Sequence, residues 1–205
     1  MSAAGARGAP KIVVGVTGAS GAPYAKRLLG VLAERWRAGE VAELACVLSD
    51  TAPEVWALEC GGHPRDLDVP IFAGRNYGAP FASGSAGWNA MVIVPCSMGT
   101  AGRIAHGVSE TLLTRAADVM LKERRTLIVV PRETPMSAQH LENLARLARD
   151  GALVLPACPS FYSRPASVDD LVDTVVARLL DHLGLSNRLM RRWGDPPARA
   201  PEVES

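Results

Sequence analysis

The sequence has few of the residues that build metal or disulfide sites. It contains four cysteines and four histidines in 205 residues, with no CxxC pair and no metal-ligand spacing. Cys46 and Cys96 lie in or beside apolar runs, where a reduced thiol packs as a small hydrophobic side chain. We therefore expect no metal, no disulfide and a reducing compartment, the cytoplasm.

Excess charge and long hydrophobic runs are also missing. The net charge is +1, so no basic surface indicates nucleic acid or an acidic membrane as a partner. The apolar runs are far too short to span a bilayer, and residues 1–10 lack the hydrophobic stretch of a signal peptide. We expect residues 1–10 to form a disordered lead-in.

Short apolar runs alternate with amphipathic segments along the rest of the chain. Strands are predicted at residues 11–17, 43–50, 90–97, 126–131 and 152–157. Helices are predicted at residues 24–36, 51–59, 99–122 with a break near Gly107, 137–150 and 167–184. This alternation predicts a mostly parallel α/β sheet wound on both faces, in one domain over residues 11–185 followed by a tail over residues 186–205.

Four of the predicted strands end in loops with unusual polar chemistry. The loops carry the sequences "TGASG" (17–21), Ser49-Asp50, "PCSMGT" (95–100) and "PRETP" (131–135). Because the carboxyl ends of parallel strands meet at one edge of a sheet, these loops should lie together, where ligands bind in open α/β sheets.

Two of these loops are suited to bind an anion. "TGASG" allows close approach of backbone amides at a helix N-terminus, although such a turn also serves simply to join a strand to a helix. Ser97 and Thr100 stand in a second turn of this kind, "PCSMGT", between a strand and a helix. Either hydroxyl could instead be an ordinary helix cap. Neither a Walker A loop nor GxGxxG is present, and Asp50 lies too far from the glycines for a dinucleotide site. A flavin mononucleotide fits the two turns better.

The cations of the predicted helices allow two interpretations. Arg115, Lys122 and Arg178 could form a solvated helix face, or they could bind a phosphate. Tyr162 follows a strand in "PSFYSRP" and should project toward the same sheet edge.

Long segments of the chain resemble one family, the UbiX-type flavin prenyltransferases. The resemblance covers about residues 11–194. It rests on the segments "TGASGAPYAKRLL", "APFASGS", "RAADVMLKE", "VVPRETP", "HLENLARLARDGALVLPACPSFYSRP" and "VDDLVDTVVARLLDHLGL". It implies a Rossmann-like (flavodoxin-like) three-layer αβα sandwich that binds FMN, usually as a dodecamer. Such enzymes join a dimethylallyl group from dimethylallyl phosphate to N5 and C6 of reduced FMN without a metal, and a UbiD-type decarboxylase receives the product.

The resemblance also implies roles for individual residues. The expected FMN-binding residues are Gly18, Ala19, Ser20, Ser49, Ser97, Met98, Thr100 and Arg132. The expected ligands of the donor phosphate are Lys122, Arg132, Tyr162 and Arg178, with Arg115 beside them. Trp193 should cover the site.

Catalysis should depend on proton transfer and on stabilisation of the departing phosphate. Glu59 is the candidate for removing the C6 proton, with Ser20 as relay, and Glu133 could move a proton to or from phosphate or flavin. Arg132 would stabilise the charge on the leaving phosphate. Tyr77 stands where the family commonly has a tryptophan, and the segment over residues 60–76 is short; both features bear on the choice of donor.

Other functions remain open at this point. A non-catalytic FMN carrier or accessory subunit has no need of a second phosphate site. A flavin-dependent cysteine decarboxylase would need a Pro-Ala-Ser-Ala-Asn-Thr motif that the chain lacks. A nicotinamide reductase and a self-sufficient aromatic acid decarboxylase are further alternatives. The sequence leaves open whether the donor is a monophosphate or a pyrophosphate.

Overall fold

The computed structural model describes residues 8–195, so most of the predicted lead-in and the end of the tail lie outside the described residues. The chain divides into two compact units, residues 1–158 and 159–205. The last predicted helix therefore groups with the tail. The expectation of a domain over residues 11–185 with a separate tail stays a prediction.

A parallel sheet of six strands forms the centre of the first unit. Its strands are β1 (Lys11–Val16), β2 (Glu43–Leu48), β3 (Ile71–Phe72), β4 (Ala90–Cys96), β5 (Thr126–Pro131) and β6 (Leu153–Val154). The spatial order is β3-β2-β1-β4-β5-β6, and every pairing is parallel. The chain thus builds outward in both directions from the β1–β4 pair, which is the switch point where such sheets bind ligands.

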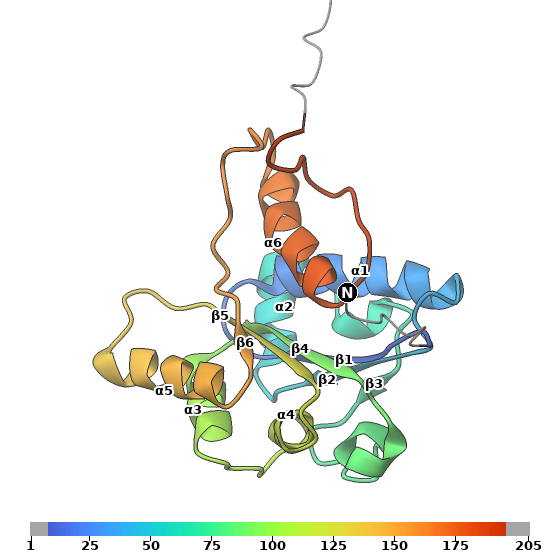
Figure 1. The fold of residues 1–205 in the computed structure, drawn as a ribbon, viewed down its shortest axis with the longest axis vertical. Helices are drawn as coiled ribbons and strands as arrows, with labels where there is room; N and C mark the ends of the chain where they lie inside the picture. The colour runs from blue at the N-terminus through green and yellow to red at the C-terminus, as the bar shows by residue number, and fades with distance from the viewer. Residues whose placement is uncertain (1–7, 196–205) are drawn as a thin grey trace, which may run out of the picture. The chain divides into compact units, whose positions relative to one another are not determined.

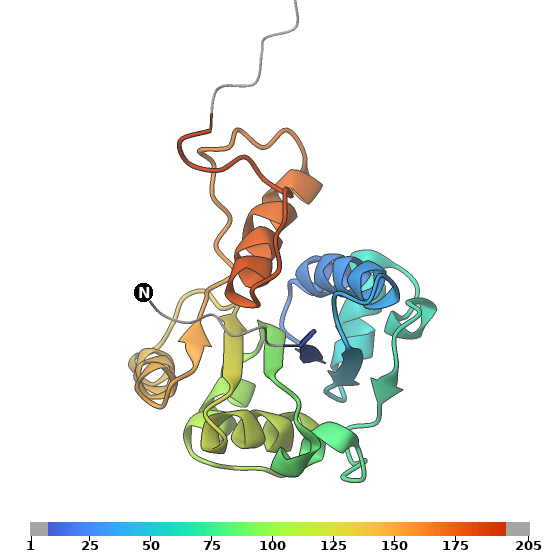
Figure 2. The same cartoon turned by 45° about the vertical axis from the view of Figure 1, so that its right-hand side comes forward.

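Helices cover both faces of this sheet (Figure 1 and Figure 2). One face carries α1 (Ala22–Arg37) and α2 (Ala52–Cys60); the other carries α3 (Met98–Ala105), α4 (Leu112–Lys122) and α5 (Ala138–Arg149). The predicted break between the third and fourth helices is confirmed, because Gly107 lies between them with a φ of +70°. The three-layer αβα architecture follows.

The core of the first unit forms where alternate strand side chains meet these helices. Val13, Ile93 and Val129 face the layer of α3, α4 and α5 and pack with buried side chains such as Leu113 and Met120. Ile12 and Val14, one residue out of phase, belong to the opposite face, and α1 contacts β1, β2 and β4 there. Strands buried on both faces explain the unbroken apolar runs in the sequence.

Several helices begin at a side-chain cap. Ser97, Thr111 and Ser137 accept hydrogen bonds from the backbone N–H three residues later, at the starts of α3, α4 and α5. In the second unit, Ser167 caps α6 (Val168–His182) in the same way, as predicted from the sequence. Among residues 8–195, every helix is too short or too polar to cross a lipid bilayer.

Candidate functional site

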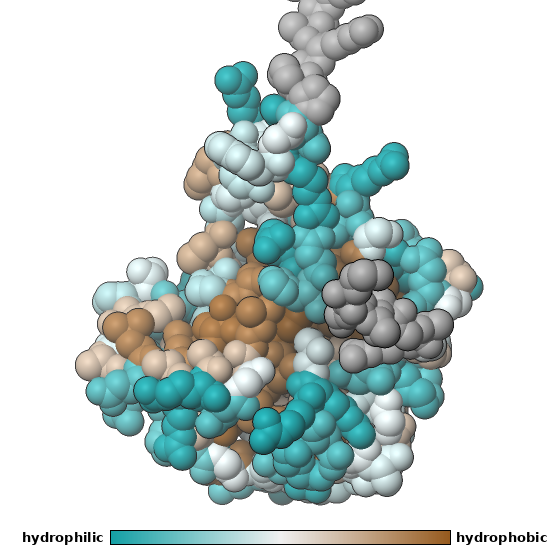
Figure 3. Space-filling view, viewed as in Figure 1, coloured by the Kyte–Doolittle hydropathy of each residue, from teal (hydrophilic) through white to brown (hydrophobic). Residues whose placement is uncertain are grey.

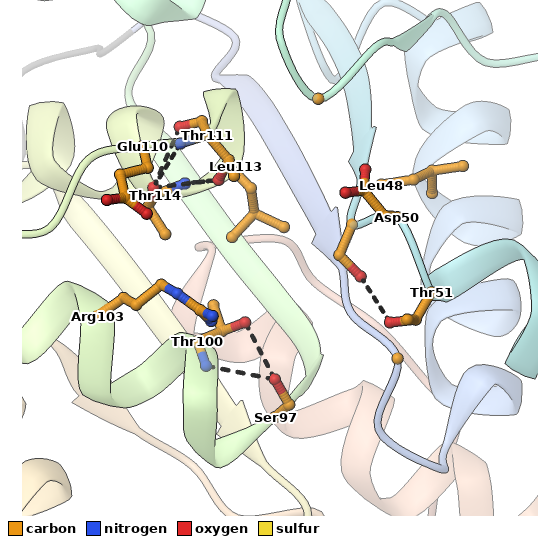
Figure 4. Close-up of a pocket in the computed structure, with 13 residues that line it drawn as sticks. Leu48, Asp50, Thr51, Ser97, Thr100, Arg103, Glu110, Thr111, Leu113 and Thr114 are labelled. Atoms are coloured by element: carbon orange, nitrogen blue, oxygen red, sulfur yellow. Dashed lines mark hydrogen bonds between the residues drawn. The ribbon is translucent and has the colours of Figure 1, made fainter.

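A cavity of about 330 Å³ opens at the carboxyl edge of the sheet, around the β1–β4 switch point (Figure 4). Its lining comprises Gly18, Leu48, Ser49, Asp50, Thr51, Gly74, Ser97, Thr100, Arg103, Glu110, Thr111, Leu113 and Thr114. Four of the residues predicted to bind FMN, namely Gly18, Ser49, Ser97 and Thr100, therefore lie around one cavity. Its volume is within the range of small-molecule sites.

Hydroxyl groups dominate the wall of this cavity. Ser97 donates a hydrogen bond to Thr100 across 3.0 Å, and the Ser49 and Thr51 hydroxyls lie 3.5 Å apart on the opposite wall. Behind the wall, the buried Thr17 hydroxyl donates to the Pro95 carbonyl at 2.7 Å and accepts from the Ser97 amide at 2.9 Å. Thr17 thereby fixes the loop after β1 against the loop after β4.

The segment before α4 completes the cavity, and it was not among the site residues expected from the sequence. Thr111 and Thr114 cap α4 reciprocally, with each side chain accepting a hydrogen bond from the backbone of the other at 3.2 Å. A T-x-x-T pattern before an apolar run is a recognisable helix start, so this signal was available. Arg103 and Glu110, which also line the cavity, lie on a helix and a loop where the sequence offers no such signal.

Beside the cavity, two backbone amides at the end of the "TGASG" loop bind a carboxylate of the same chain. Gly21 N and Ala22 N each donate to Oε2 of Glu59 at 2.8 Å, at the N-terminus of α1. Burial raises the pKa of Glu59, but hydrogen bonds from Ser20, Gly21 and Ala22 and the charge of Arg132 lower it below its ordinary value of 4.5. Glu59 is therefore ionised at neutral pH and pairs with Ser20, its predicted proton relay.

Arg132 joins this cluster from the end of β5. Its amide donates to the Cys96 carbonyl at 3.3 Å, which fixes the loop after β5 to the end of β4. The charge of Arg132 also acts on Tyr24. Burial and the neighbouring Cys158 raise the pKa of the Tyr24 hydroxyl, and the positive charge of Arg132 lowers it. The neighbouring Glu133 accepts a hydrogen bond from the Thr134 amide at 3.0 Å. Ser20, Glu59 and Arg132 thus lie within electrostatic reach of one another.

The remaining predicted residues of the first unit lie outside the cavity lining. Arg115 pairs with Asp118 at 3.0 Å, and Lys122 pairs with Glu123. Met98 packs in the hydrophobic core, and Ala19 lies in the loop beside Gly18. The half-exposed Tyr77 donates its hydroxyl to the backbone carbonyl of Glu110 at 2.5 Å and so fastens the rim of the cavity.

Three predicted residues belong to the second unit. The rings of Tyr162 and Trp193 meet edge to face, with centroids 5.7 Å apart, and together line a depression of about 320 Å³. Arg178 pairs with Asp181 at 2.8 Å. Arg192 was not among the residues expected from the sequence. Its two hydrogen bonds of 2.6 and 2.7 Å to Asp181 lower the pKa of that carboxylate.

Comparisons with known proteins show the family to which the chain belongs. The model of the flavoprotein family matches residues 2–180. The flavin prenyltransferase UbiX of Methanothermobacter thermautotrophicus is 44% identical over 185 residues, which cover 89% of this chain and 94% of that protein.

Solved structures of similar proteins share the fold. A dodecameric FMN-dependent UbiX-like decarboxylase from Escherichia coli O157:H7 is 42% identical, with a TM-score of 0.85 over 90% of this chain and 100% of that one. AnUbiX (PadA1), solved with FMN and dimethylallyl pyrophosphate, is 38% identical, with a TM-score of 0.84 over 92% of this chain and 99% of that one. The predicted flavodoxin-like fold is confirmed. The chain belongs to the flavoprotein family and, within it, to the UbiX flavin prenyltransferases.

Proposed function

We propose that this chain transfers a dimethylallyl group from dimethylallyl phosphate to N5 and C6 of reduced FMN and closes a fourth ring. The observation that carries the proposal is that one sheet edge holds both a hydroxyl-lined cavity and the cluster of Ser20, Glu59 and Arg132. Hydroxyl groups at helix starts suit the polar chain of a flavin nucleotide, and the cluster combines an ionised carboxylate with a cation.

The cavity residues Gly18, Ser49, Ser97 and Thr100 would hold FMN, with the neighbouring backbone of Ala19, Ser20 and Met98. Reduced FMN, when bound, supplies the nucleophilic ring that accepts the prenyl group. The protein's own residues hold the flavin, exclude water and move a proton. The Ser20 hydroxyl donates a hydrogen bond to the Glu59 carboxylate. Ser20 can therefore pass its own proton to Glu59 when it accepts one from the flavin.

We assign Lys122, Arg132, Tyr162 and Arg178 to the binding of the donor phosphate, with Arg115 beside them and Trp193 as a cover. Arg115 and Lys122 now pair with Asp118 and Glu123, whose side chains are 36% and 35% exposed, and Arg178 pairs with Asp181, whose side chain is 21% exposed. Ion pairs near the surface contribute only about 0–1 kcal/mol, so a phosphate dianion can replace the carboxylates of Asp118 and Glu123 at little cost.

We further propose that the protein acts as a homo-oligomer, a dodecamer, and passes its product to a UbiD-type decarboxylase. Exposed apolar side chains support association: Leu58 is 81% exposed and Leu141 is 55% exposed. Figure 3 presents hydrophobic atoms over the part of the sheet where β5 and β6 lie. Contiguous apolar surface such as that over β5 and β6 marks contacts with other chains.

The proposed reaction is tested by anaerobic incubation of the protein with FMN, dithionite and dimethylallyl phosphate, followed by mass spectrometry of the released flavin. A flavin heavier by one five-carbon isoprenyl unit is the expected product. Unmodified FMN that stays bound, with the pyrophosphate donor failing too, would indicate a flavin carrier instead. A protein that binds no flavin would overturn the whole assignment.

Gly18→Ala should disrupt the cavity. A Cβ at this position would lie 2.0 Å from Oγ1 and 2.7 Å from Cβ of Thr51, a short branched side chain that cannot move its own Cβ aside. The wall formed by Thr51 must therefore shift, which should lower the free energy of unfolding by about 1–3 kcal/mol. FMN affinity should fall about tenfold, as measured by quenching of flavin fluorescence.

Gly30→Ala is the matched control. Gly30 lies inside α1, and a Cβ there would meet nothing within 4 Å. Alanine favours the helix by roughly 0.5–1 kcal/mol, so this variant should be more stable and should bind FMN normally. Equal FMN affinity in both variants would contradict the placement of Gly18 in the flavin site.

A further inference from the structure

The cavity contains a single cation among the described residues that line it. Arg103 carries that positive charge, and Asp50 and Glu110 carry negative ones. None of the three first-unit cations expected from the family resemblance, Arg115, Lys122 and Arg132, lines this cavity. Without Arg103 the wall would have only carboxylates as charged groups, and it would repel a phosphate dianion.

The guanidinium of Arg103 is available to a ligand. Within residues 8–195 it makes no hydrogen bond or ion pair, whereas Arg115 and Lys122 each pair with a neighbouring carboxylate. Figure 4 shows the side chain of Arg103 extending along α3 toward Thr100 and Ser97. Its Nη1 lies 3.5 Å from where a Cβ on Gly99 would be, so it reaches the first turn of α3.

Hydroxyl donors lie where this side chain ends. Ser97 and Thr100 share a hydrogen bond of 3.0 Å on the same wall, and Thr111 and Thr114 stand on the adjacent wall (Figure 4). A planar guanidinium flanked by hydroxyl groups can bind two phosphate oxygens at once, a geometry that a lysine cannot reproduce.

We propose that Arg103 recognises the phosphate of FMN and thereby makes the cavity selective for FMN over riboflavin. The proposal rests on the proposed function, since it takes this cavity as the flavin site. It assigns the two phosphates of the reaction to different cations: the flavin phosphate to Arg103, and the donor phosphate to the set that includes Arg132. Riboflavin has the same ring and the same ribityl chain, so only the phosphate distinguishes the two ligands.

Binding of FMN and of riboflavin to Arg103→Met and Arg103→Lys, measured without donor by flavin fluorescence, tests this inference. The Met variant should weaken FMN binding roughly 10- to 100-fold, the usual range for a lost charged hydrogen bond, and should change riboflavin binding less than about twofold. The Lys variant should fall between the wild type and the Met variant. Arg103 is exposed, so both variants should fold normally.

Arg146→Met is the control, because Arg146 is an exposed arginine of α5 outside the cavity lining and its replacement changes the net charge equally. Its affinities for both flavins should match those of the wild type. Equal weakening of FMN and riboflavin binding in Arg103→Met, or no weakening at all, would overturn the Arg103 assignment alone. A wild-type protein that binds neither flavin would overturn the proposed function and this inference together.

Discussion

Replacing Glu59 by glutamine should slow formation of the four-ringed flavin by roughly 10²- to 10⁴-fold, the usual contribution of a general base. Glutamine keeps an oxygen that can accept hydrogen bonds from the Gly21 and Ala22 amides, as Oε2 of Glu59 does at 2.8 Å. It cannot accept the proton that ring closure releases. Because Glu59 lies outside the cavity lining, FMN affinity should stay close to that of the wild type.

The pH dependence of the same carboxylate has a definite sign. Its pKa is lowered below 4.5 in the folded protein, because hydrogen bonds and Arg132 outweigh burial. Its stabilising effect is therefore present above the pKa of the unfolded chain and is lost as the pH falls through the lower folded value. Activity that depends on ionised Glu59 should decline only below pH 4.5, and Glu59→Gln should lack this acid-dependent loss of stability.

Glu54→Gln is the matched control for this experiment. Glu54 is an exposed residue near the start of α2, the helix that carries Glu59, and the substitution removes the same charge. Single-turnover assays with quantified product should find Glu54→Gln unchanged. If Glu59→Gln made the four-ringed flavin at the wild-type rate, Glu59 would not be the base, and its role would be limited to capping α1.

The fold was predictable because its strands are buried on both faces. Five strands appear in the sequence as apolar runs, and their parallel arrangement follows from the helices between them. β3 was missed, since Ile71 and Phe72 are only two residues within a segment rich in Gly and Pro. A strand of two residues forms only because it pairs with β2, and this pairing cannot be predicted from the local sequence.

The site was predictable in part, for a similar reason. Polar residues that directly follow strands, such as Ser49 and Ser97, reach the ligand edge wherever the sheet is parallel. Arg103 reaches the cavity only because α3 packs where it does, and in the sequence it is an ordinary helical arginine. Glu59 likewise accepts hydrogen bonds from the amides of Gly21 and Ala22, which lie 38 and 37 residues earlier, so these contacts also depend on the tertiary fold.

Arg132→Met should lower kcat/KM for dimethylallyl phosphate by roughly 10²- to 10³-fold, the loss seen when one preorganised donor to a developing charge is removed. Breaking the donor's C–O bond builds negative charge on the phosphate, and Arg132 stands at the sheet edge near the carboxylate of Glu59. Removing the guanidinium also takes away one influence that lowers the pKa of Glu59, so the acid limit of activity should move to higher pH.

The Arg132 and Arg103 variants together separate the two phosphates of the reaction. Arg132→Met should act mainly on the donor, and Arg103→Met mainly on FMN, because only Arg103 lines the flavin cavity. Steady-state kinetics with each substrate varied in turn, beside flavin titrations, measure both effects. Arg149→Met, an exposed arginine of α5, controls for the loss of charge. If Arg132→Met left the donor kinetics intact and weakened only FMN binding, the division of the phosphates between the two arginines would be wrong.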